Sequence, residues 1–209
     1  MSASLREETG DRPLTGPGGP VRVLVTGGTS GLGLAMASAL AQAGAAVALT
    51  GRSGPRAQAV AADLSGAIGV ELDVRDESSV TRAVDEAWSR LGGIDMLANN
   101  AGIASTMHRA RFVPYGPSRA GSEALSRIMA ADLRDTGVTV NLLLPGGATV
   151  TGMLPLDAVP EGRAFLDAAV MGPPVVWLAS EDASGVHDER IVATDFAHWL
   201  RDRTTERRS

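Results

Sequence analysis

The sequence predicts an α/β fold, a doubly wound and mostly parallel sheet with helices on both faces, on three observations. Short apolar segments alternate along the chain with longer segments of helical periodicity. The apolar segments are continuous runs, as expected of strands buried on both faces. A glycine cluster joins the first of these runs to the first helical segment. Right-handed crossovers would wind such a sheet so that ligands bind at the carboxyl ends of its strands.

The first part of the chain contains three predicted strands and two predicted helices. Residues 21–26 (VRVLVT) form an apolar run that ends in glycines, which indicates a buried strand. Residues 31–43 are rich in Ala and Leu and are followed by a glycine, the usual end of a helix. Residues 45–50 (AAVALT) predict the second strand. Residues 56–64 place four apolar side chains on one helix face, and residues 68–74 (IGVELDV) predict the third strand.

The clearest helix lies between Asp76 and Leu91. Its apolar residues recur at helical spacing, Asp76 is a suitable N-cap, and two glycines follow Leu91. Residues 118–134 place Leu125, Ile128 and Met129 on one helix face. The apolar run at 139–144 could lie next to the fourth strand, at 94–98. The remaining predicted elements are strands at 94–98, 139–144 and 190–193 and helices at 118–134 and 175–179.

Composition and charge set the domain organisation and narrow the classes of partner. The 209 residues suffice for one domain, predicted at 21–195, with a disordered leader at 1–20 and a charged tail at 196–209. The net charge of -5 argues against a nucleic-acid or membrane partner. The chain has no cysteine, no histidine spacing typical of a metal site, and no apolar run long enough to span a bilayer. We therefore expect a cytoplasmic protein without a metal.

The segment TGGTSGLG, Thr26 to Gly33, predicts a phosphate-binding turn. It follows a predicted strand and opens a predicted helix, which is the context that a dinucleotide-binding (Rossmann) turn requires. The amides at the start of the helix would face a pyrophosphate, favoured by the helix dipole. The expected cofactor-binding residues of this turn are Gly27, Thr29, Ser30, Gly31, Leu32 and Gly33.

The end of the second predicted strand indicates which dinucleotide binds. An acidic residue there would bind the ribose hydroxyls of NAD, whereas an arginine accommodates the 2′-phosphate of NADP. The chain has Arg52 at this point, and Arg56 follows closely. We therefore expect NADP, with NAD as the less favoured alternative. Asp73, at the end of the third strand, is placed to meet the adenine edge.

Five motifs in order resemble the short-chain dehydrogenase/reductase family over residues 21–195. They are the glycine turn, DV at Asp73-Val74, NNAG at 99–102, a YxxxR segment at 115–119 and PGGAT at 145–149. The resemblance implies that the additional cofactor contacts are Val74, Asn100, Ala101, Gly102, Tyr115, Arg119, Pro145, Gly146 and Thr149.

The catalytic centre implied by the resemblance departs from the family pattern twice. Tyr115, the single tyrosine, would be the general acid/base, but Arg119 stands where the family has a lysine, and the chain contains no lysine at all. A nearby positive charge is needed to lower a phenol pKa from about 10, and arginine supplies it with a bulkier, planar group. Only twelve residues separate Gly102 from Tyr115. One helix–strand unit of the family is therefore expected to be missing, and Ser105 is the nearest hydroxyl to serve as the carbonyl donor.

Two functions follow from this resemblance. The first is an NAD(P)-dependent oxidoreductase that moves hydride between nicotinamide and a small carbonyl or alcohol substrate. The alternative is a catalytically impaired NADP-binding pseudoenzyme with a sensing or scaffold role, because a shortened segment misplaces Tyr115. The resemblance also implies a homo-oligomer, weakened because one of its two pairing helices is absent.

Overall fold

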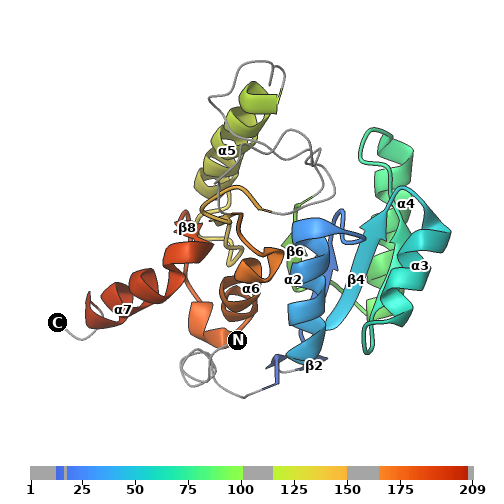
Figure 1. The fold of residues 1–209 in the computed structure, drawn as a ribbon, viewed down its shortest axis with the longest axis horizontal. Helices are drawn as coiled ribbons and strands as arrows, with labels where there is room; N and C mark the ends of the chain where they lie inside the picture. The colour runs from blue at the N-terminus through green and yellow to red at the C-terminus, as the bar shows by residue number, and fades with distance from the viewer. Residues whose placement is uncertain (1–12, 17, 101–114, 150–164, 207–209) are drawn as a thin grey trace. The chain divides into compact units, whose positions relative to one another are not determined.

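The computed structural model describes residues 13–16, 18–100, 115–149 and 165–206 (Figure 1). Contacts divide the chain into two compact units, and each is described here by itself. The first comprises Met1–Gly102 and Met171–Asp182, and the second comprises Ile103–Val170 and Ala183–Ser209. Within these described ranges no helix is long and apolar enough to cross a membrane.

The first unit is built on a four-stranded parallel sheet in the order β5-β4-β3-β6. All four strands were predicted from their apolar runs. Side chains of β3 and β4 are almost wholly buried, as expected for the centre of a parallel sheet. The strands are β3 (Arg22–Val25), β4 (Ala46–Gly51), β5 (Ile68–Glu71) and β6 (Met96–Ala98).

Helices cover both faces of this sheet, which confirms the predicted doubly wound arrangement (Figure 1). On one face Leu24 and Ala48 contact Ala87 of α4. On the other face α2 packs on β3 and β4, α3 packs on β4 and β5, and α6 packs on α2. These helices are α2 (Gly31–Gln42), α3 (Gly54–Ala62), α4 (Glu77–Leu91) and α6 (Gly172–Leu178).

The ends of α4 lie where the sequence placed them. The Asp76 side chain accepts a hydrogen bond from the Ser78 amide at 3.0 Å, and Gly92 ends the helix in the left-handed conformation with φ 76°. Ala83 and Ala87 face the sheet, whereas Val84 and Trp88 are 38% and 58% exposed. The predicted apolar face of α4 is therefore only partly buried.

The predicted disordered leader is wrong for its last residues. Residues Thr15–Gly16 (β1) and Gly19–Pro20 (β2) pair as a short antiparallel hairpin. Leu14 is only 4% exposed, and its amide donates to the Ala43 carbonyl at 2.8 Å. The end of α2 anchors Leu14 through a contact between segments that are distant in sequence. Such a contact cannot be read from composition, and the Gly and Pro content of the segment therefore suggested a disordered leader.

The second unit contains a two-stranded parallel sheet of β7 (Leu142–Leu144) and β8 (Arg190–Val192), with α5 (Tyr115–Asp132). Within the described residues of this unit β7 pairs with β8, and the place of β7 beside the fourth strand stays a prediction. The predicted apolar face of α5 is largely exposed: Leu125, Ile128 and Met129 are 57%, 58% and 41% exposed.

The predicted charged tail is a helix over most of its length. Helix α7 spans Phe196–Glu206. Phe196 is 3% exposed and stacks on Trp199, whose ring also lies 5.4 Å from the guanidinium carbon of Arg203. Phe196 and Trp199 are three residues apart, a spacing that places both on one helix face. The sequence prediction gave more weight to the charged residues of this segment and missed that pattern.

Asp95 anchors the start of β3 to the turn before β6, and it gives a prediction on pH. Its carboxylate accepts from the amide of Arg22 at 2.9 Å and from the Arg22 guanidinium at 2.8 Å and 2.5 Å. These hydrogen bonds lower the pKa of Asp95. A lowered folded-state pKa means that the stabilisation is present above the unfolded value, near 3.9, and is lost as pH falls through the folded value.

We expect Asp95→Asn to reduce the free energy of unfolding at pH 7 by about 1 kcal/mol, a value discounted for solvent screening of this half-exposed pair. Urea unfolding between pH 7 and pH 3 checks it, because the deficit should shrink below about pH 4. An equal deficit at both ends of that range would show that the carboxylate charge does not matter.

Candidate functional site

The glycine turn lies between β3 and α2 at the carboxyl end of the sheet, as predicted. Gly27 and Gly31 have φ of 66° and 55°, values in the left-handed region that favours glycine. The turn is held against β4, because the Gly28 amide donates to the Thr50 carbonyl at 2.8 Å and the Gly27 amide to the Thr50 hydroxyl at 3.3 Å. The backbone of the turn is therefore held in place by hydrogen bonds to Thr50 of the neighbouring strand β4.

Gly33 closes the turn by close packing. A Cβ at this position would collide with the Gly27 carbonyl oxygen and with the side-chain nitrogen of Asn100. Gly28 is similarly confined, since its Cβ would lie 2.7 Å from the Leu49 Cβ. The glycine turn approaches β4 through Gly28, and the first turn of α2 approaches Asn100 through Gly33, at distances that only glycine permits.

Asn100 clamps the turn from the opposite side. Its amide nitrogen donates to the carbonyls of Thr26 and Gly27 at 3.1 Å and 3.2 Å, and its backbone amide donates to the Thr26 hydroxyl at 3.0 Å. The motif resemblance implied a cofactor contact for Asn100. The geometry gives its side chain a bracing role, since it fixes the carbonyls of the turn, and the cofactor contact stays a prediction.

The start of α2 offers backbone amides to an anion. Ser30 is the N-cap residue in extended conformation, its side chain makes no capping hydrogen bond, and no acidic residue lies in the first helical turn. The first amides of a helix have no partner within the helix, and the dipole places partial positive charge there. The amides of Gly31, Leu32 and Gly33 are thus available in a site that favours negative charge.

The end of β4 brings Thr29 and Arg52 to the same edge of the sheet. A Cβ on Gly51 would lie 2.6 Å from the Thr29 methyl carbon, so Thr29 packs directly over this strand end. Arg52 and Arg56 are exposed. Ser53 caps α3 by accepting from the Arg56 amide at 3.4 Å. Both arginines therefore follow within five residues of the carboxyl end of β4, where a 2′-phosphate is expected.

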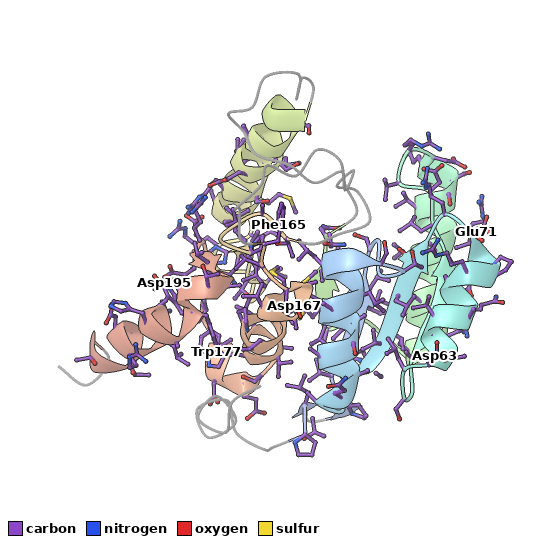
Figure 2. All side chains as sticks on the ribbon, in the orientation of Figure 1. Asp63, Glu71, Phe165, Asp167, Trp177 and Asp195 are labelled. Atoms are coloured by element: carbon purple, nitrogen blue, oxygen red, sulfur yellow. The ribbon has the colours of Figure 1, made fainter. Side chains whose placement is uncertain are left out.

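Glu71 also supports the start of α3. Its carboxylate accepts from the Gly54 amide at 3.1 Å, and Figure 2 shows its side chain beside α3. A Cβ on Gly54 would lie 2.8 Å from the same carboxylate oxygen. This acidic side chain thus binds the start of α3. The residue that directly follows β4 is Arg52, whereas Glu71 is the last residue of β5.

Asp73 lies just beyond β5 and is held by Arg75. The guanidinium of Arg75 binds both carboxylate oxygens, at 2.6 Å for the shortest contact, and this pairing lowers the pKa of Asp73 to about 2. Val74 is 54% exposed. The sequence placed Asp73 at the adenine edge without its partner, since nothing in the motif indicates that Arg75 folds back onto it.

The other predicted site residues fall in the second unit or outside the described residues. Tyr115 and Arg119 both belong to α5, four positions apart on one helix. Gly146 has φ 93°, and Thr149 is 7% exposed with its hydroxyl 3.3 Å from the Gly147 carbonyl. Ala101, Gly102 and Ser105 lie outside the described residues. Pro145, half-buried, follows β7 directly.

Two polar residues of the second unit were missed by sequence reasoning. His187 accepts from the Val140 amide at 3.2 Å through Nδ1, and its Nε2 lies 2.7 Å from the Ala130 carbonyl of α5. Asn141 binds the Val186 carbonyl at 2.8 Å and accepts from the Glu189 amide at 3.1 Å. These contacts join the end of α5 to β7 and β8, and no local motif predicts them.

The clamp by Asn100 gives a prediction. Asn100→Asp replaces two donors by acceptors that face the carbonyls of Thr26 and Gly27, so it should lower the free energy of unfolding by about 2–3 kcal/mol. Asn99→Asp is the matched control, because it makes the same charge change at an exposed neighbouring position. Urea unfolding of both variants measures the difference. Equal stability of the two variants would show that the clamp is dispensable.

No group of three or more His, Asp or Glu side chains that could hold a metal ion is found among the residues that the structure describes.

Comparisons with known proteins agree with this site. A family model described as short chain dehydrogenase matches residues 21–110. The chain is 47% identical over 85 residues to 3-oxoacyl-(acyl-carrier-protein) reductase FabG of Aquifex aeolicus, a match that covers 38% of the chain and 34% of that relative. The chain therefore spans only about a third of that relative's length in this match.

A longer match extends over both units. The chain is 30% identical over 221 residues to 3-oxoacyl-(acyl-carrier-protein) reductase MabA of Mycobacterium avium, which covers 78% of the chain and 84% of that relative. Among solved structures, a short chain dehydrogenase from Burkholderia cenocepacia in complex with NADP aligns with a TM-score of 0.69 and 26% identity, over 82% of this chain and 95% of that one. With the glycine turn built as described, these relatives show that the chain is a member of the short-chain dehydrogenase/reductase family of NAD(P)-dependent oxidoreductases.

Proposed function

We propose that this chain binds NADP at the glycine turn and reduces or oxidises a small carbonyl or alcohol substrate. The observation that carries the proposal is the open start of α2, where Ser30 leaves the helix amides free of a side-chain cap. The amides of Gly31, Leu32 and Gly33 would hold the pyrophosphate. Arg52 would bind the 2′-phosphate, which a guanidinium recognises through two parallel hydrogen bonds.

The proposed catalytic residues are Tyr115, Arg119 and Ser105. NADPH supplies the hydride to the carbonyl carbon when it is bound. Tyr115 would donate the proton to the carbonyl oxygen, and the permanent charge of Arg119 would lower the pKa of its phenol from the ordinary value near 10. Ser105 would donate a hydrogen bond to the carbonyl oxygen. The domain that carries this chemistry is proposed to be 21–195.

A pseudoenzyme that binds NADP without turnover is the alternative, and two observations favour it. Arg119 stands where the family has lysine, and only twelve residues separate Gly102 from Tyr115. The match to the reductase of Mycobacterium avium runs over 221 aligned positions but takes in only 78% of the 209 residues, so that relative has residues that this chain lacks. A missing unit before Tyr115 would account for this difference.

The experiment that separates the two functions is a turnover assay on the full chain. NADPH is mixed with a panel of small ketones and aldehydes, NADP with the matching alcohols, and the nicotinamide absorbance is followed. Turnover of any substrate supports the enzyme. Saturable NADPH binding without turnover across the panel supports the pseudoenzyme, and absence of binding contradicts both.

We further propose that the exposed face of α5 forms a contact between copies of the chain. Leu125, Ile128 and Met129 are large apolar side chains that lie about half exposed on one helix face. We expect the full chain to sediment as an oligomer, and Ile128→Glu to sediment as a monomer because it places a charge within that face. A monomer already in the unsubstituted chain would contradict the contact.

A further inference from the structure

The ion pair between Arg75 and Asp73 lies just beyond the end of β5, outside the glycine turn. Arg75 binds Asp73 through three guanidinium contacts of 2.6 Å, 2.9 Å and 3.2 Å, and its backbone amide donates to the same carboxylate at 3.1 Å. The Asp73 backbone amide is fixed in turn by the Ser79 hydroxyl at 3.1 Å. The carboxylate is thus held in place and both of its oxygens are engaged.

The charge of Asp73 acts on the arginine that is expected to bind the 2′-phosphate. Arg52 follows β4, Asp73 follows β5, and the two strands are hydrogen-bonded neighbours in the sheet. Gly51 and Glu71, which closely precede these two residues, face each other across the strand pair, so Arg52 and Asp73 follow at the same edge of the sheet. The pKa of Asp73 is lowered chiefly by its hydrogen bonds to Arg75 and to a lesser extent by the charge of Arg52. An uncompensated carboxylate at this edge of the sheet would weaken the attraction of Arg52 for a phosphate.

Arg75 removes that effect. Its guanidinium neutralises Asp73 while its own side chain remains 75% exposed, compared with 31% for Asp73. With the pair intact, the charge of Asp73 is balanced by Arg75 beside Arg52, and the carboxylate of Glu71, the last residue of β5, accepts from the Gly54 amide. Without Arg75, the unpaired carboxylate would oppose the attraction of Arg52 for the 2′-phosphate, which is the group that distinguishes NADP from NAD.

We propose that Arg75 is a specificity-determining residue, which favours NADP over NAD by neutralising Asp73 next to the 2′-phosphate site. The inference rests on the proposed function, since it assumes that a dinucleotide binds at the turn. It concerns only the adenosine end of the cofactor, so it requires no turnover. Adenosine 2′,5′-bisphosphate and adenosine 5′-monophosphate are therefore sufficient probes, because they differ only in the 2′-phosphate.

The test is a charge cycle measured by calorimetric titration of the full chain with both nucleotides. Arg75→Gln should lower the preference for the bisphosphate about fivefold, as expected for one unit charge a few ångströms from a phosphate in water. Asp73→Asn should raise that preference, and the double variant should return to within about twofold of the unsubstituted chain. Arg82→Gln is the matched control, because it removes one arginine from α4, where the side chain binds Ser78.

Each outcome decides between two readings. Restored preference in the double variant supports neutralisation, because only the charge balance is shared with the unsubstituted chain. A double variant as poor as Arg75→Gln overturns it, since Arg75 would then contact the phosphate itself. Equal weakening of both nucleotides in Arg75→Gln also overturns it. If the unsubstituted chain binds neither probe nor NADPH, the proposed function fails instead.

Discussion

Replacement of Gly33 by alanine is expected to abolish NADPH binding and to destabilise the first unit. The new methyl group would collide with the Gly27 carbonyl and the Asn100 side chain, so the turn or the clamp must move. Overpacking of this kind costs about 1–3 kcal/mol of folding free energy. The loss of two charge-assisted hydrogen bonds to the pyrophosphate would raise the Kd for NADPH by a factor of at least about one hundred. Calorimetry and urea unfolding measure the two effects.

The matched control for Gly33→Ala is the same substitution at Gly121. This glycine lies within α5, is exposed, and has open space where a Cβ would be added. Alanine is the better helix former there, so Gly121→Ala should stabilise the chain by about 0.5–1 kcal/mol and leave NADPH binding unchanged. If Gly33→Ala behaves like Gly121→Ala in both measurements, the close packing of the turn has no functional role.

Tyr115→Phe is expected to remove turnover while NADPH binding remains. The substitution deletes only the phenol hydroxyl, and a positioned general acid contributes about 10²–10⁴-fold to the rate. The kcat for a substrate found in the carbonyl panel measures the loss, and calorimetry measures the retained Kd. Turnover that Tyr115→Phe leaves intact would exclude Tyr115 as the proton donor.

Arg119 should modulate the same step. Lysine at this position supplies a compact ammonium group in place of a planar guanidinium, whereas methionine supplies no charge. We expect Arg119→Met to lower kcat further than Arg119→Lys does, and to move the pH–rate profile toward higher pH because the phenol loses its nearby positive charge. Identical profiles for the two variants would show that Arg119 does not act on Tyr115.

The sequence was sufficient for the four-stranded sheet of the first unit and for its glycine turn, because the signals of these elements are local. The strands of its sheet are continuous apolar runs, α4 has its cap and its terminal glycines, and the turn needs glycines at positions where the backbone requires them. Each of these is decided by residues within a few positions of one another. The same locality explains why Gly27, Gly31 and Gly33 could be placed in the turn from the sequence, while their contact with a cofactor stays a prediction.

The features that sequence reasoning missed depend on contacts between distant segments. Leu14 is ordered because Ala43 accepts its amide, and β7 pairs with β8 across more than forty residues. The helix at the C-terminus was hidden because charged residues surround Phe196 and Trp199. The bracing role of Asn100 needed the fold, since a motif identifies the residue but not the carbonyls that it binds.

The central claim is that the glycine turn binds NADP, and its most direct test is a titration of the full chain with NADPH. Calorimetry measures the heat of binding, and thermal unfolding measures the change in Tm. Uncapped amides at the start of α2 predict saturable binding of one nucleotide per chain. At a ligand concentration of about 100 times Kd, the stabilisation of about 2.7 kcal/mol should raise Tm by roughly 5–11 °C, and NADH should give a smaller shift. No heat of binding and an unchanged Tm with both nucleotides would contradict the account.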